Sequence, residues 1–448
     1  MTRVIEELTD TTAFDIFAKM RKKGDILLES TLHNQLGRYT IAGIRPYMKV
    51  EQRESLYVNG RAQAGTIADY LKTYFEIHKE KNPYHLPFWD GAIGFFSYDY
   101  GREQMGISSR HQKEDALPLA EFTFYDGIIV EDHFKQKVYM IANGKTCRPE
   151  ELLEEVKQKE SLPSLKSVIK EKAEWKSDFS DPEYQQAIAK MIDHMYQGDI
   201  YVVNMTQQLR MERDAAPFAV YRNLRELNPA PFAAFMEEED YAILCSSPER
   251  FLKREGNCLT TRPIKGTRGR GSTEAEDTAH RKELKNSEKD QCELRMIVDL
   301  ERNDFHKICR PGSVKVPDLF EIEAYATVFH LSATVEGELD QADCMDIIKA
   351  AFPGGSITGA PKKRAMELID EVERSRRGLY TGTIGYMALD GNCDFNIVIR
   401  TLVYQDGRYQ MGAGGGITCE SELQFETNEV YQKAEALKRA LEGESYGV

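Results

Sequence analysis

Residues 261–271 (TRPIKGTRGRG) combine residue types that could bind or attack an anionic substrate. Glycine lets a ligand approach the backbone closely, and Lys265 and the neighbouring arginines can pair with carboxylates. A lysine amine can also act as a nucleophile when its surroundings favour the uncharged form. Taken alone, the segment is equally well explained as an exposed basic turn.

Two pairs of acidic residues are candidate metal ligands. Asp290 and Glu293 lie three residues apart in one predicted helix, so they share a helical face. Glu426 and Glu429 repeat this spacing in the last predicted helix. With 73 acids in 448 residues, about 12 such pairs are expected by chance, and a solvated helix face explains either pair alone. Two pairs that met in space would form an oxygen-rich site suited to Mg²⁺.

Two glycine-rich segments could accommodate a ligand. In residues 352–363 (FPGGSITGAPKK), backbone amides at the start of a helix can hold a carboxylate or hydroxyl. In residues 412–416 (GAGGG), the missing side chains leave room for a flat ring. A plain glycine turn is the alternative for the first segment. The second does not match GxGxxG before a helix, so nucleotide binding is not expected.

Composition narrows the class of protein. The net charge of −14 argues against nucleic acid and anionic membranes as partners. No apolar run approaches the roughly 20 residues of a membrane span, and acids interrupt the start of the chain where a signal peptide would be apolar. We therefore expect a soluble, cytoplasmic protein. The eight cysteines occur singly without a CxxC motif, which indicates reduced thiols rather than structural zinc.

The elements that must position these residues indicate an α+β protein. Residues 25–143 alternate short strands with turns and include one predicted helix at 67–78. After residue 181, strands alternate with helices, with helices predicted at 276–300 and 423–441 and a strand at 395–406. We expect a β-rich N-terminal subdomain (residues 1–160), a linker (161–181) and a second domain (182–445).

The motifs resemble, in order, those of the chorismate-utilising enzymes, a family that includes anthranilate synthase component I and aminodeoxychorismate synthase component I. The resemblance rests on PERF, PIKGT, EKDxxE with IVDLxRND, HLSATVEG, PGGSITGAPK, RRGLYTGTIGY with NIVIRT, AGGG and ExxExxxKA. It is close over residues 184–441 and implies two large, mainly antiparallel β-sheets packed as a sandwich with helices outside. Residues 182–445 would then form the chorismate-binding catalytic domain.

The resemblance also implies roles for individual residues. A magnesium ion would hold the ring carboxylate of chorismate, bound directly by Glu293 and Glu429, with Asp290 and Glu426 in or beside the same shell. Glu249 would act as the general acid that protonates the departing 4-hydroxyl. His330 would lie beside the reacting ring and position it. The residues implied to contact chorismate are Gly266, Thr267, Thr358, Tyr380, Arg400, Gly414, Gly415 and Gly416.

Lys265 distinguishes two activities within this family. Anthranilate synthases tend to have alanine there, whereas aminodeoxychorismate synthases often have a lysine that attacks ring carbon 2 as the 4-hydroxyl leaves. Ammonia then enters at carbon 4 and expels the lysine. We therefore expect the large subunit of an aminodeoxychorismate synthase, which makes 4-amino-4-deoxychorismate for 4-aminobenzoate and folate synthesis. Anthranilate synthase component I and a non-catalytic chorismate-binding protein are the alternatives.

Val202 separates the chain from relatives that add water, because they have a basic lysine at the matching place. A valine cannot activate water. Relatives that use ammonia usually have glutamine there, so Val202 differs from both groups.

A partner and a second binding site are also implied. No GxCxG nucleophile elbow of a glutaminase is present, so ammonia would come from a separate glutamine amidotransferase subunit. Segments that resemble the tryptophan pocket of many relatives include Leu28, Glu29, Ser30, Pro231 and Phe232. The alternative interpretation is that these are buried strand residues with no binding role.

Overall fold

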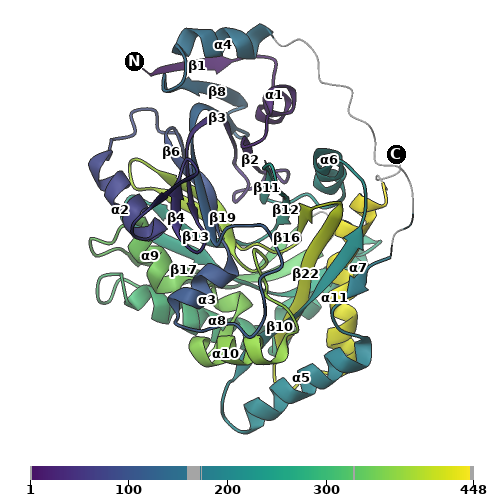
Figure 1. Cartoon of the computed structure of the whole chain (residues 1–448). Helices are drawn as coiled ribbons and strands as arrows, with labels where there is room; N and C mark the ends of the chain where they lie inside the picture. The colour runs from purple at the N-terminus through teal and green to yellow at the C-terminus, as the bar shows by residue number, and fades with distance from the viewer. Residues whose placement is uncertain (1–2, 159–171, 173, 326–327, 444–448) are drawn as a thin grey trace.

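The computed structural model describes residues 3–158, 172, 174–325 and 328–443. Strands run through the middle of the molecule and most helices lie at its periphery (Figure 1). The predicted linker lies mostly outside the described residues, and the predicted domain boundaries stay predictions.

The N-terminal part is β-rich, as predicted. The helix expected at 67–78 is α2, but α1 and α3 were not expected. Strand β6 (Gly91–Phe96) ends where Ser97 caps the helix α3 (Tyr98–Gln104) by accepting a hydrogen bond from Tyr100 N at 3.1 Å. The elements are β1 Val4–Leu8, α1 Ala13–Met20, β2 Ile26–Glu29, β3 Tyr39–Gln52, β4 Leu56–Val58, β5 Arg61–Gln63, α2 Ile67–Ile77, β6 Gly91–Phe96, α3 Tyr98–Gln104, β7 Ala120–Asp132, β8 Lys137–Ala142 and α4 Pro149–Gln158.

The second part mixes strands and helices. Its elements are β9 Lys176–Ser177, α5 Asp181–Tyr196, β10 Val202–Glu212, α6 Pro217–Leu227, β11 Phe232–Glu237, β12 Ala242–Ser247, β13 Arg250–Glu255, β14 Cys258–Arg262, β15 Ile264–Gly269, α7 Glu274–Asn286, α8 Glu288–His306, β16 Lys315–Ala324, β17 Val328–Glu338, α9 Cys344–Ala351, the short 3₁₀ helix η1 Gly355–Ile357, β18 Gly359–Ala360, α10 Lys362–Val372, β19 Thr383–Ala388, β20 Cys393–Asn396, β21 Thr401–Gln405, β22 Arg408–Ile417 and α11 Leu423–Leu441.

Two predicted elements of this part are interrupted. The helix expected at 276–300 is two helices, because Ser287 leaves the helical conformation and accepts a hydrogen bond from Asp290 N at 3.3 Å, which starts α8. The strand expected at 395–406 is broken between β20 and β21. There Arg400 adopts a left-handed backbone conformation, with φ of 52°. Both interruptions lie beside residues that the sequence singled out.

The strands of the two parts belong to one hydrogen-bonded network. β2 pairs with β11, and β6 pairs with β19. All pairings between the described strands are antiparallel. The predicted α+β fold, with mainly antiparallel strands and helices outside, is therefore confirmed. The sheets of the predicted sandwich are continuous through these pairings.

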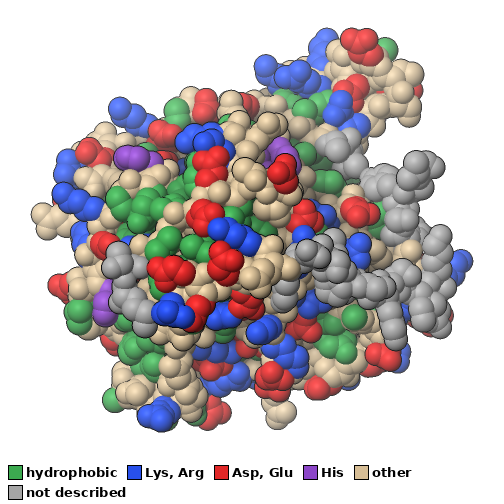
Figure 2. Space-filling view, turned by 90° about the horizontal axis from the view of Figure 1, so that it is seen from above, with side chains coloured by type: hydrophobic (Ala, Val, Ile, Leu, Met, Phe, Trp, Pro, Cys, Tyr) green, Lys and Arg blue, Asp and Glu red, His purple; other side chains and the backbone are tan. Residues whose placement is uncertain are grey.

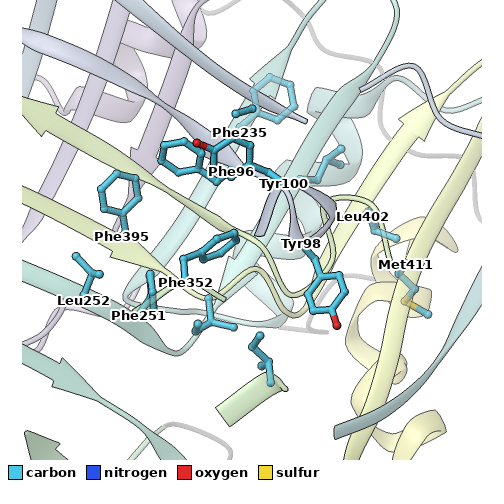
Figure 3. Packing of buried hydrophobic residues seen from close by; sticks show 14 of the residues in the cluster. Phe96, Tyr98, Tyr100, Phe235, Phe251, Leu252, Phe352, Phe395, Leu402 and Met411 are labelled. Atoms are coloured by element: carbon cyan, nitrogen blue, oxygen red, sulfur yellow. The ribbon is translucent and has the colours of Figure 1, made fainter. Parts of the chain in front are cut away.

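An aromatic core supports the turn that carries η1 (Figure 3). The ring centroid of Phe352 lies 6.3 Å from that of Phe96 and 5.8 Å from that of Phe251. A Cβ added to Gly354 would lie 2.9 Å from Ile397 Cδ1 and 3.4 Å from the Phe251 ring, so the core packs closely against this backbone. The core therefore fixes the backbone that leads to Ser356.

The surface carries charged side chains of both signs. Figure 2 shows acidic and basic side chains interspersed over the face seen from above. All eight cysteines are free thiols. Within the described residues, no helix combines the length and the apolar character needed to cross a membrane.

Candidate active site

One cavity of about 240 Å³ gathers segments that are far apart in the sequence. Its walls come from β10, β15, α8, β17, η1, β22 and α11, and from the segments before β13, β19 and β21. Every residue predicted for the chorismate and magnesium sites lines it except Thr358. The lining includes Glu249, Lys265, Gly266, Thr267, Asp290, Glu293, His330, Tyr380, Arg400, Gly414, Gly415, Gly416, Glu426 and Glu429.

Lys265 lies on β15 at a bulge in the pairing with β17. The next residue, Gly266, has a φ of 71°, a conformation that favours glycine. Lys265 Nζ donates a hydrogen bond to the carbonyl of Ser356 at 3.1 Å. A Cβ added to Gly416 would lie 3.2 Å from Nζ, so the bare β22 backbone leaves room for this amine.

Glu249 is buried on the same side of the cavity as η1. Ser356 Oγ donates a hydrogen bond to Glu249 Oε1 at 2.8 Å. Burial raises the pKa of Glu249 above its ordinary value, which favours the protonated form that a general acid needs. Ser356 therefore contacts both the candidate acid and the candidate nucleophile, Lys265.

His330 is buried on β17. Burial lowers its pKa to about 4, and the nearby charge of Arg400 acts in the same direction. The imidazole is therefore neutral at neutral pH. Its Nδ1 lies 3.0 Å from Thr267 Oγ1, and its ring meets that of Tyr325 edge-on at 5.0 Å. These contacts hold the imidazole ring in place, as expected of a residue that positions the substrate ring.

The four candidate metal ligands come from two helices, with Asp290 and Glu293 on α8 and Glu426 and Glu429 on α11. Burial raises the pKa of Glu293 to about 6, and it also raises the pKa of Glu426. Burial acts upwards on Glu429 too, but the Lys433 ammonium, 2.9 Å away, holds the pKa of that carboxyl below its ordinary value. Glu429 therefore ionises more readily than Glu293 and Glu426.

The donor chemistry of these acids fits a hard cation, because Mg²⁺ prefers carboxylate oxygens. Glu426 Oε1 is buried without a hydrogen-bond partner among the described residues, although Lys289 Nζ lies 3.5 Å from it. Asp290 contacts Arg268 at 3.1 Å. In the described part of the chain, no three His, Cys, Asp or Glu residues are close enough together to hold an ion. The side chains of Arg268, Lys289 and Lys433 lie beside these acids.

Glycines of β22 form the wall opposite Lys265. A Cβ on Gly414 would lie 2.1 Å from the Met205 carbonyl, and one on Gly415 would lie 2.4 Å from Glu429 Oε2. Tyr380 is buried beside this strand, and a Cβ on Gly412 would lie 2.1 Å from its ring. Side chains at Gly415 and Gly416 would fill the space beside the carboxylates.

Thr358 lies behind the cavity wall. Its side chain is fully buried, and its hydroxyl donates a hydrogen bond to the Gly354 carbonyl at 2.8 Å. Its own carbonyl accepts a hydrogen bond from Asn204 N at 2.8 Å. Thr358 therefore shapes the η1 turn and the adjoining strand and does not line the cavity.

Sequence reasoning missed four polar residues of the cavity. Ser356 lies within the PGGSITGAPK motif but was not singled out. Lys433 follows Glu429 by four residues, a spacing that predicts an ion pair on a helix. Lys289 and Asn204 carried no local signal. Val202, which was singled out, is buried opposite Ala360 and does not line the cavity.

A second cavity, of about 270 Å³, lies beside the paired strands β2 and β11. Ser30 Oγ donates a hydrogen bond to the Pro231 carbonyl at 2.8 Å, which joins the two segments. Glu29 accepts hydrogen bonds from Tyr221 Oη at 2.7 Å and from Arg225. The five residues predicted for a tryptophan pocket all line this cavity: Leu28, Glu29, Ser30, Pro231 and Phe232.

Comparisons with known proteins agree with this geometry. Residues 25–439 match the family described as chorismate binding enzyme. The chain is 38% identical to aminodeoxychorismate synthase component 1 of Bacillus subtilis, over 96% of this chain and 94% of that protein. It is 34% identical to anthranilate synthase component 1 of Aquifex aeolicus, over 98% and 94% of the two chains.

Two solved structures share the fold of this chain. Anthranilate synthase component I from Streptococcus pneumoniae superposes with a TM-score of 0.81 at 30% identity, covering 91% of this chain and 94% of that chain. The menaquinone-specific isochorismate synthase MenF of Escherichia coli shares the fold at 16% identity, with a TM-score of 0.75 over 98% of this chain and 94% of that chain. The chain belongs to the chorismate binding enzyme family and is an enzyme that acts on chorismate.

Proposed function

We propose that this protein is the large subunit of an aminodeoxychorismate synthase, which aminates chorismate to 4-amino-4-deoxychorismate. The observation that carries the proposal is the position of Lys265 in the cavity. Its amine and the Glu249 carboxyl are linked through one residue, Ser356, at 3.1 and 2.8 Å. A nucleophile and an acid held this closely can act on the same ring.

The proposed reaction has two displacement steps. Lys265 Nζ forms a bond to ring carbon 2 while the bond between carbon 4 and its oxygen breaks. Glu249 supplies a proton, so the hydroxyl leaves as water. Ammonia then forms a bond to carbon 4, the carbon 2–Nζ bond breaks, and its electron pair returns to the lysine. Chorismate and ammonia thus give 4-amino-4-deoxychorismate and water.

Chorismate carries two carboxylates, so its site must supply local positive charge although the chain has a net charge of −14. Arg400, between β20 and β21, offers a guanidinium that can bind a carboxylate at two points. Glu293 and Glu429, with Asp290 and Glu426, would hold Mg²⁺, which would supply positive charge for the second carboxylate when bound. The glycines of β22 leave room for that group.

The proposal includes a separate ammonia-supplying subunit. The relatives at 38% and 34% identity are both named component 1, which supports a further component. We propose that this component is a glutamine amidotransferase. We also propose that the cavity beside β2 and β11 takes tryptophan.

Anthranilate synthase is the second candidate. Its support is the similarity to relatives of that name, at 34% identity for a sequence and 30% for a solved structure. The two activities share chorismate and ammonia but differ in the ring carbon that is aminated. Anthranilate formation also releases pyruvate, so the products distinguish the candidates.

The test is a mass-spectrometric product assay with chorismate, Mg²⁺ and ammonium, with and without an added aminodeoxychorismate lyase. We expect 4-aminobenzoate only when the lyase is present. Lys265→Ala should lower this turnover at least about 100-fold, since it removes the nucleophile. Lys363→Ala, which changes an exposed lysine outside the cavity, should leave turnover unchanged. Anthranilate from the unmodified protein without the lyase would establish the second candidate instead.

A further inference from the structure

Lys362 is a buried lysine that does not line the active-site cavity. It is the first residue of α10, and its side chain is 9% exposed. Nζ donates hydrogen bonds to Asp304 Oδ2 at 2.6 Å, to the Ala351 carbonyl at 2.8 Å and to the Pro353 carbonyl at 2.7 Å. A lysine ammonium has three N–H donors, so each donor has an acceptor here.

The place of this lysine is unfavourable by itself. Positive charge at the N-terminus of a helix opposes the helix dipole. Burial disfavours the charged form as well and lowers the pKa of Lys362, although the Asp304 carboxylate acts against this shift. A residue that breaks a local rule in a folded protein commonly serves a non-local requirement. What Nζ holds therefore indicates the role of Lys362.

Lys362 holds the segment that leads into η1. Ala351 is the last residue of α9, and Pro353 lies two residues before Gly355, where η1 begins. The third acceptor, Asp304, lies on α8. One ammonium group thus joins α8, the end of α9 and the start of α10, and it fixes the backbone between α9 and η1 at two carbonyls.

We propose that Lys362 is a positioning residue for the reaction, because the segment that it holds carries Ser356. Ser356 contacts Glu249 at 2.8 Å and Lys265 at 3.1 Å. Only two residues separate Pro353 from Ser356, so the fixed Pro353 carbonyl limits where Ser356 can lie. Lys362 acts through Ser356 and not on the substrate. The inference rests on the proposed roles of Glu249 and Lys265 in the amination of chorismate.

Lys307 offers a matched control, since it contacts the same carboxylate. Its Nζ lies 2.8 Å from Asp304 Oδ1, and its side chain is 52% exposed. Its other acceptor is the Ala350 carbonyl, within α9, at 3.3 Å. Lys307 therefore distinguishes the effect of any cation beside Asp304 from the effect of holding the segment before η1.

Steady-state kinetics of Lys362→Met test the proposal, because methionine is unbranched and nearly as long but has neither donors nor charge. We expect kcat to fall about tenfold, since the contacts of Ser356 are loosened. The KM for chorismate should change less than about twofold, because Arg400 and the glycines of β22 do not lie on this segment. Lys307→Met should change kcat less than about twofold.

A double-mutant cycle with Ser356→Ala distinguishes positioning from general destabilisation. Ser356→Ala already removes the hydrogen bond to Glu249. In that background, Lys362→Met should therefore lower kcat by a factor at least about threefold smaller than in the unmodified protein. Effects of independent residues would multiply instead. Urea unfolding of each variant shows that the kinetics are measured on folded protein.

Full multiplication of the two effects would overturn the proposal, since Lys362 would then act by a route other than Ser356. An equal loss of kcat in Lys307→Met would overturn it as well, and so would a higher KM for chorismate with unchanged kcat. If Lys362→Met does not fold, Asp304→Asn, which keeps an acceptor but removes its charge, is measured in the same cycle.

The product assay on the unmodified protein separates these results from failure of the proposed function. Anthranilate as the sole product refutes the proposed function. The cycle of kcat values, measured with that product, still reports on whether Lys362 acts through Ser356.

Discussion

Ser356 is the residue through which the two candidate catalytic groups are arranged. Its hydroxyl holds the Glu249 carboxyl, and its carbonyl accepts from Lys265. The conformation of one short turn therefore sets the positions of an acid and a nucleophile. Beneath this turn, Ile397 and Phe251 pack against Gly354.

Ser356→Ala should shift the pH dependence of kcat/KM. The Ser356 hydrogen bond favours the charged form of Glu249 and so lowers its pKa, against the larger effect of burial. Without that bond the pKa of Glu249 rises. A general acid is active while protonated, so the loss of activity at high pH should begin at a higher pH.

We also expect kcat to fall about tenfold, because the carboxyl loses a hydrogen bond and its fixed position. A pH profile from 5 to 9 measures both effects. Ser313→Ala, which removes a hydroxyl bonded to the Arg310 carbonyl away from the cavity, should change neither. A shift of the alkaline limb to lower pH would contradict the assigned role.

At the scale of elements, α8 and α11 determine where the candidate metal ligands lie. α8 begins at Glu288 because Ser287 interrupts the helical segment and caps the new helix. Asp290 and Glu293 lie in its first two turns, so the position of this helix start sets the position of both acids. α11 packs against β22 and presents Glu429 beside Gly415.

Substitutions at two helix caps distinguish an effect on stability from an effect on activity. Ser287→Ala on α8 and Thr66→Ala on α2 each remove a side-chain acceptor at a helix N-terminus. Each should lower the free energy of unfolding by about 1 kcal/mol, measured in urea. Only the α8 variant should also lower turnover, because α2 lies outside the cavity.

Ser287→Thr retains a capping hydroxyl and should restore most of the stability and activity. Equal loss of turnover in Ser287→Ala and Thr66→Ala would mean that general destabilisation, rather than the position of α8, limits activity.

At the scale of the whole molecule, a buried polar cluster joins the two parts of the chain. Glu121 Oε2 accepts a hydrogen bond from Tyr241 Oη at 2.8 Å and lies 3.0 Å from Lys49 Nζ. Lys49 also contacts Glu238 at 2.9 Å. Glu121 and Lys49 belong to β7 and β3, whereas Tyr241 and Glu238 lie around the turn between β11 and β12. Burial raises the pKa of Glu121 to about 7.

This pKa predicts a pH-dependent stability. The folded protein retains a proton on Glu121 up to about pH 7, whereas the unfolded chain releases it near its ordinary pKa of 4.5. The contribution is therefore fully present below pH 4.5 and is lost as pH rises through 7. Urea unfolding between pH 4.5 and 8 should show stability falling with pH from this group.

Glu121→Gln should flatten that part of the slope, because glutamine does not titrate. Glu239→Gln, at an exposed acid paired with Lys23, should leave it unchanged. An equally steep slope in Glu121→Gln would assign the dependence to other groups.

Local sequence patterns accounted for much of the fold and of the candidate site. The last helix has the predicted bounds. The motif residues of the cavity were identifiable because each motif lies within one short segment. The nucleophilic role expected of Lys265 came from the resemblance to the chorismate-utilising enzymes, as did the roles expected of Glu249 and His330.

Tertiary structure alone decided how these segments meet. The double contact of Ser356, with Glu249 and with Lys265, joins residues that are far apart in the sequence. The burial of Thr358 depends on the η1 turn, which packs against the core. The break between β20 and β21 that carries Arg400 likewise depends on hydrogen bonds to other loops. The sequence by itself determined which residues can do chemistry, because residue type and local spacing are local properties. Which atoms are satisfied, buried or free to bind a ligand follows only from non-local strand pairing and packing.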